Sequence, residues 1–134
     1  MKIVLDSNIL VAAVATRGAC AELFARVLSV HRYAVNAQIL TEVQKALLEK
    51  FKVPPTEVDA AITQLRDTAT VLEAAALPEK VSRDPDDDGI LALAKAFGAE
   101  ILVTGDQDLL VLHPWEGIQI VRPQKFWLLD RQAT

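Results

Sequence analysis

Six acidic residues are spread through the sequence at positions from which folding could collect them. They are Asp6, Glu42, Asp86, Asp87, Asp88 and Asp106. Carboxylate oxygens are the ligands that Mg²⁺ and Mn²⁺ prefer. Carboxylates gathered in one place would repel one another unless a cation were bound among them. The sequence therefore predicts a divalent-metal site, provided that the fold brings these residues together.

Short apolar runs alternate with helical patterns along the chain. The runs at 2–5 and 101–104 are typical of strands that are buried on both faces of a parallel sheet. Weaker strand candidates lie at 33–35, 70–72 and 119–121, and helical patterns cover 19–30, 38–51, 56–68 and 86–97. This alternation predicts an α/β fold, with helices on both faces of a sheet of about five strands.

Such a topology would bring the acidic residues to one edge of the sheet. In open parallel sheets, ligands bind beyond the carboxyl ends of the strands, and each following helix begins at that edge. Asp6 and Asp106 end strands, and residues 86–88 begin a helix. Glu42 lies beside the inward-facing stripe of the helix at 38–51, one turn from its start, so it can point toward Asp6.

Each motif also has an explanation without metal. Asp84 can cap a helix, and the acids at 86–88 complement the helix dipole. Residues 6–8 and 104–108 can be simple turns, and Glu42 can be a solvated residue near a helix N-terminus. Capping requires only one or two acids, however, and a charge that closes a buried strand requires a partner. The convergence of the motifs favours a metal site.

These motifs resemble the PIN domain family, and in particular its bacterial VapC-like toxins. The resemblance is carried by residues 5–10, Glu42, residues 88–94 and residues 103–110, in the family's order, and it covers the chain from residue 2 to about residue 128. It implies a three-layer α/β/α sandwich around a central parallel sheet of about five strands. It also implies a metal-dependent endoribonuclease that uses Mg²⁺ or Mn²⁺ and cleaves RNA.

The resemblance also assigns roles to individual residues. The acids of the family, which would bind metal and form the catalytic set, correspond to Asp6, Glu42, Asp88 and Asp106. Supporting residues would be Ser7, Asn8, Thr104, Asp87 and Asp108. Asp88 is taken as the third acid in preference to Asp87 because the Ile-Leu-Ala run at 90–92 follows it. Ser7 stands where the family more often has Thr.

Composition limits the class of protein. With 134 residues, of which 51% are hydrophobic and 24% charged, the chain suits a single domain at 1–134. The net charge of −4 argues against binding phosphates by bulk positive charge. An RNA substrate would therefore need bound cations and local basic residues, for which Arg17, Arg83 and Lys95 are candidates. The single cysteine, Cys20, excludes an internal disulfide and fits a reducing compartment.

The sequence also carries expectations about location and partners. Asp6 and Asn8 interrupt the apolar N-terminus, so neither a signal peptide nor a membrane span is predicted, and a cytoplasmic protein is expected. The resemblance implies a homodimer and an antitoxin protein as partners. The apolar run at 126–129 could form such an interface, although a final helix packed on the domain's own core is the favoured interpretation.

Two other functions stay open as alternatives. A PIN-like scaffold could bind RNA or protein without cleavage, but the presence of all four acids favours catalysis. A receiver-like regulatory module also collects acids around Mg²⁺. That module would need a phosphoacceptor Asp after its third strand and a Lys after its last. The strand candidates at 70–72 and 119–121 are instead followed by Glu73 and Arg122, which disfavours this alternative.

Overall fold

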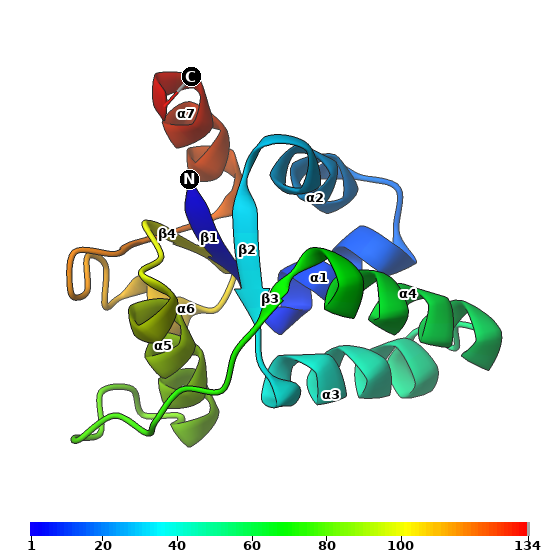
Figure 1. Cartoon of the computed structure of the whole chain (residues 1–134), viewed down its shortest axis with the longest axis horizontal. Coiled ribbons are helices and arrows are strands. Elements are labelled where there is room, and N and C mark those ends of the chain that lie inside the picture. Colours follow the sequence, from blue (N-terminus) through cyan, green and yellow to red (C-terminus); the bar gives the residue numbers. More distant parts are fainter. Residues whose placement is uncertain (134) are drawn as a thin grey trace.

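Five parallel strands form the centre of the molecule (Figure 1), and the computed structural model describes residues 1–133. The strands are β1 (Lys2–Leu5), β2 (Arg32–Val35), β3 (Thr70–Val71), β4 (Ile101–Val103) and β5 (Gln119–Val121), in the spatial order β3-β2-β1-β4-β5. This result confirms the predicted parallel sheet. The order differs from the 2-1-3-4-5 order of receiver domains, so the receiver-like alternative is excluded.

Helices cover both faces of this sheet. They are α1 (Ser7–Ala15), α2 (Ala19–Val30), α3 (Ala37–Lys45), α4 (Pro55–Thr68), α5 (Pro85–Phe97), α6 (Gln107–Leu110) and α7 (Pro123–Ala133), and a π turn, η1 (Ala46–Lys50), continues α3. In Figure 1, α1 to α4 lie on one side of the strands, whereas α5 and α6 lie on the other. The three predicted layers are therefore present.

The core is built around the middle strand. Ile3, Val4 and Leu5 of β1 are each fully buried, as expected for a strand covered on both faces. The side chain of Phe126 on α7 is also fully buried, and α7 contacts β4, β5 and α2. The final helix therefore packs on the chain's own core, as predicted, although Leu128 remains half-exposed.

Helix caps place polar side chains at the carboxyl edge of the sheet. Asp6, which follows β1, caps α1 through its own carboxylate, and Asp106 caps α6 in the same way after β4. Asp84 accepts a hydrogen bond from the backbone N–H of Asp86 and caps α5, with Pro85 at the first helical position. The capping explanation is thus correct for Asp84. For Asp6 and Asp106, capping uses only part of each carboxylate.

Two helices were not among those predicted. The sequence of α1 is apolar along nearly its whole length, so it lacks the periodicity that marks a surface helix. It is covered by α2 and α3, which explains why it needs no polar face. The other missed helix, α6, is only four residues long and is too short for a periodic signal.

No single helix in the described part of the chain is long and apolar enough to cross a membrane. Helices α1 and α2 meet that length and composition test only together, as a pair bent by 106°.

Candidate active site

Asp6 lies at the middle of the carboxyl edge, directly after β1, and its side chain is almost completely buried. The hydroxyl of Thr104 donates to its Oδ2 at 2.7 Å, and the backbone N–H of Ser7 donates to its Oδ1 at 2.8 Å. Burial raises the pKa of Asp6, and the charge of Asp106 adds to this effect, while the hydrogen bonds oppose it. None of the described Lys or Arg side chains forms an ion pair with Asp6.

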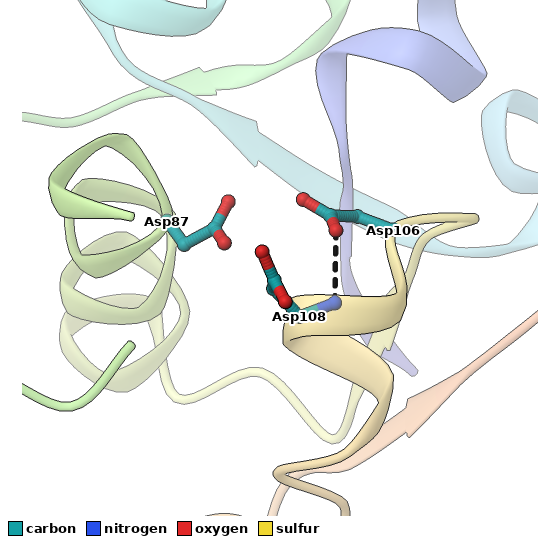
Figure 2. A group of neighbouring side chains, drawn as sticks. All are labelled: Asp87, Asp106 and Asp108. Carbon is teal, nitrogen blue, oxygen red and sulfur yellow. Dashed lines mark hydrogen bonds between the residues drawn. The ribbon is translucent and has the colours of Figure 1, made fainter. Parts of the chain in front are cut away.

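A group of three carboxylates lies beside Asp6. Asp87, Asp106 and Asp108 each offer one oxygen, and these oxygens lie within 4.8 Å of one another. Figure 2 shows Asp87 on α5 directed toward the short helix that carries Asp108 and begins after Asp106. The backbone N–H of Asp106 donates to the hydroxyl of Thr104 at 2.9 Å, so this one hydroxyl connects Asp6 with the group.

Asp87 has the most strongly perturbed pKa of these acids. Only 4% of the residue is exposed, and burial raises its pKa from the ordinary value of 3.8 to about 7. The charges of Asp106, Asp84 and Asp6 act in the same direction, and a hydrogen bond from the hydroxyl of Ser82 at 3.1 Å opposes them. A nearby divalent cation would reverse this shift, because it favours the ionised carboxylate.

Glu42 reaches the same edge from α3. Its Oε1 is buried and has no hydrogen-bond partner among the residues that the structure describes. Burial raises the pKa of Glu42, the charges of Asp6 and Asp86 raise it further, and a hydrogen bond with Gln38 opposes them. An unsatisfied buried polar atom costs about 1–3 kcal/mol. This orphaned oxygen and the neighbouring carboxylates fit the oxygen-rich shell that Mg²⁺ or Mn²⁺ requires.

Comparison with known protein families identifies the family of the domain that carries this site. The family model described as PIN domain matches residues 2–108, which include every acid of this site. The chain belongs to the PIN domain family. The match confirms the resemblance seen in the sequence. Members of this family are generally nucleases.

Two solved structures show the same fold as this PIN domain. VapBC2 from Rickettsia felis, bound to a DNA fragment from its promoter, gives a TM-score of 0.61 at 14% identity, covering 90% of this chain and 97% of that chain. VapC20 from Mycobacterium tuberculosis, described as a toxin that cleaves the sarcin-ricin loop, gives a TM-score of 0.61 at 13% identity, covering 87% of this chain and 98% of that chain. Comparison with curated proteins gives no match.

The structure does not bring Asp88 into the acidic group of this PIN domain. Its two oxygens instead accept the backbone N–H groups of Ser82 at 2.8 Å and Val81 at 3.2 Å, so Asp88 holds the loop that precedes α5. Asp87, predicted only as a supporting residue, lies with Asp106. Consecutive residues on a helix point about 100° apart, so only one of the two can face this edge. The geometry favours Asp87 over the predicted Asp88 as the third acid.

The remaining predicted residues lie around the acids. Ser7 is buried, and its hydroxyl lies 3.4 Å from Oδ1 of Asp6. Asn8 is exposed and lines a cavity of about 430 Å³ together with Glu42 and other residues of α1 and α3. Asp108 forms an ion pair of 2.7 Å with the exposed Arg83. Arg83, a candidate substrate contact, is therefore at the site but is bound to one of its acids.

Gln38 is a part of the site that sequence reasoning missed. Its Nε2 donates to the backbone carbonyl of Asp86 at 3.0 Å, and it also hydrogen-bonds Glu42. A Cβ added to Gly89 would lie only 2.2 Å from its Oε1. Gln38 thus joins α3 to the start of α5, and any side chain at position 89 would force the end of Gln38 to move. The available signal was Gly89 itself, since a glycine inside a helical pattern can mark a close contact.

Replacing Gly89 with alanine is expected to reduce cleavage more than stability. The new methyl group would displace Gln38, whereas the better helix propensity of alanine, about 1 kcal/mol, would offset the lost contact in the unfolding free energy. Loss of such a supporting contact typically lowers the activity of a metal site by about tenfold or more. Cleavage rates and thermal unfolding of Gly89→Ala would be compared with Gly18→Ala, a position with open space around it. Equal rates in both variants would refute the role of Gln38.

A Thr104→Val variant is expected to be less stable by about 1–3 kcal/mol, since it removes the buried hydroxyl that bonds both Asp6 and the backbone of Asp106. Valine has nearly the same shape, so the loss would report the hydrogen bonds rather than a cavity. Urea unfolding would measure it, with Thr63→Val on the exposed face of α4 as the matched control. An unchanged midpoint for Thr104→Val would show that the hydroxyl contributes nothing.

Proposed function

We propose that this PIN domain is a divalent-metal-dependent endoribonuclease that hydrolyses RNA phosphodiester bonds. The observation that carries the proposal is the convergence of Asp6, Asp87 and Asp106 with the orphaned oxygen of Glu42. None of these four acids has an ion-pair partner among the described Lys and Arg residues. Such a concentration of unpaired carboxylates at one edge is explained best by a bound cation.

Each acid has a distinct part in the proposed reaction. Asp6, Asp87 and Asp106 would hold Mg²⁺ or Mn²⁺, with Thr104 and Ser7 fixing the carboxylate of Asp6. When bound, such an ion lowers the pKa of water and offsets charge on the leaving oxygen. Glu42, whose pKa is raised by burial and by the neighbouring carboxylates, would orient the attacking water or accept its proton. The water would attack phosphorus directly, and no covalent enzyme intermediate would form.

We further propose that the chain is the toxin of a toxin–antitoxin pair in the cytoplasm. Support comes from the PIN family and from the shared fold with VapBC2 and with VapC20, which is described as a sarcin-ricin loop cleaving toxin. By this analogy the substrate is RNA, the partner is an antitoxin protein and the toxin forms a homodimer. The alternative is a PIN-like scaffold that binds RNA or protein without cleaving it.

Cleavage of a structured RNA pool by the purified protein tests the proposed activity. Reactions with Mg²⁺ or Mn²⁺ would be run beside an EDTA control and the Asp6→Asn variant. Cleavage by the wild type that is lost in both controls is the expected result. Equal activity of wild type and Asp6→Asn would overturn the assigned site. RNA binding without cleavage under all conditions would favour the scaffold alternative.

A further inference from the structure

A second hollow lies along the same sheet edge, between α6, β5 and the start of α7. Its volume is about 440 Å³. The apolar part of its lining comes from Leu110, Ile120 and Val121. The PIN family match ends at residue 108, so all of the residues that line this hollow except Gln107 lie beyond the matched part of the chain. None of its lining residues belongs to the predicted site.

The charge of the hollow is opposite to that of the acidic site. Arg122 and Lys125 line it, and neither forms an ion pair with any described residue. No acidic residue is among the described residues that line the hollow, although the chain has 18 acidic and 14 basic residues. The hollow therefore combines an apolar surface with two free cations in an otherwise acidic protein.

Polar groups around the hollow supply hydrogen-bond donors. The guanidinium of Arg122 donates to Oε1 of Gln107 at 3.3 Å. Because Gln107 directly follows Asp106 in the chain, this bond holds Arg122 close to the acidic site. Nδ1 of His113 accepts the backbone N–H of Ile120 at 2.9 Å. The neutral ring therefore carries its proton on Nε2, which leaves one more donor. Phosphate oxygens suit the cations, and the apolar surface with its donors suits a nucleobase.

The topology places this hollow next to the acids. Asp6 and Arg122 directly follow β1 and β5, and Asp106 lies three residues beyond the end of β4. The strands β1, β4 and β5 are neighbours in that order. Since the carboxyl ends of parallel strands meet at one edge, Arg122 continues the row that the two acids begin. The cavity lined by Asn8, Glu42 and Lys45 lies toward α1 and α3 instead. A polynucleotide that crosses the acids along the edge would meet the basic hollow on the β5 side.

We propose that this hollow binds a nucleotide of single-stranded RNA next to the phosphate that is cleaved. Arg122 and Lys125 would bind its backbone phosphate, while the partly exposed Leu110 would contact the base. The inference rests on the proposed ribonuclease function, because it assigns the substrate class to a neighbouring subsite. It differs from the earlier expectation, in which Arg17, Arg83 and Lys95 were the candidate contacts.

The test measures RNA binding separately from cleavage. In the Asp6→Asn background, fluorescence anisotropy would give the Kd of a labelled single-stranded RNA for the double variant Arg122→Gln with Lys125→Gln. The expected loss of affinity is about tenfold at low salt. The slope of log K against log salt concentration should also become shallower by about 1.4, because each of the two lost contacts to a single-strand phosphate contributes about 0.7 to that slope. The exposed positions of both side chains should leave the fold intact, which circular dichroism would check.

A matched control separates the hollow from bulk charge. Arg32→Gln with Arg66→Gln removes the same charge from two exposed positions outside both cavities, and its affinity should be nearly unchanged. Equal affinity of the hollow variant and its parent, or an equal loss in the control, would overturn the inference. Cleavage by the wild type is scored independently. If the wild type cleaves RNA while the hollow variant binds normally, only the subsite is wrong; if the wild type does not cleave, the proposed function fails.

Discussion

The Asp6→Asn variant is expected to cleave RNA at least about 100-fold more slowly than the wild type while remaining folded. A bound cation supplies several kcal/mol of charge stabilisation in the transition state, and a loss of about 2.7 kcal/mol is already a factor of 100. Asparagine has the size of aspartate and can still accept the backbone N–H of Ser7. The hydroxyl of Thr104 can rotate to accept from the new amide.

The rate loss would be measured under single-turnover conditions with saturating Mn²⁺. Asp67→Asn, an exposed substitution on α4, makes the same change of charge away from the edge and should retain the wild-type rate. Thermal unfolding of both variants would check the fold. A wild-type rate for Asp6→Asn would mean that cleavage occurs elsewhere or comes from a contaminant.

Without divalent cations, the protein is expected to become less stable as pH rises from 4 to 7. In this range the folded state keeps a proton on Asp87, whose pKa is about 7, while the unfolded chain, with the ordinary pKa of 3.8, has released it. The unfolded state then binds fewer protons, so the free energy of unfolding falls by up to about 1.4 kcal/mol per pH unit. Asp6 and Glu42 act in the same direction, because their pKa values are also raised.

Urea unfolding in EDTA at several pH values would measure this slope. Asp87→Asn should flatten it and should be more stable than the wild type near neutral pH, because the buried charge is removed. Asp59→Asn, exposed on α4, is the matched control and should keep the wild-type slope. A slope that Asp87→Asn leaves unchanged would show that Asp87 does not titrate in this range.

Added Mg²⁺ or Mn²⁺ should restore stability near neutral pH in the same experiment. A ligand that binds only the folded state stabilises it by about 2.7 kcal/mol at a concentration of 100 Kd. Asp87→Asn should lose most of this gain, since it removes one of the proposed ligands, whereas Asp88→Asn should keep it. The opposite result would restore Asp88 as the third acid.

Much of the fold followed from local patterns. Apolar runs of three or four residues marked the strands of the sheet, because strands covered by helices on both faces contain few polar side chains. The convergence of Asp6, Asp106 and Glu42 also followed, since the carboxyl ends of parallel strands share an edge. Helix α1 was not predicted because a helix that is apolar along nearly its whole length has no periodic face.

The sequence by itself determined the α/β class, the edge at which the acids meet and the PIN family. Only the tertiary structure decided between Asp87 and Asp88, placed Gln38 against Gly89 and assembled the basic hollow around Arg122. Buried residues follow both acids at spacings of three and four along α5: Ile90 and Leu91 follow Asp87, and Leu91 and Ala92 follow Asp88. These nearest neighbours therefore do not by themselves decide the orientation of the helix. The orientation of α5 is set by side-chain packing against segments that lie far apart in the sequence. These contacts form only when the whole core is assembled.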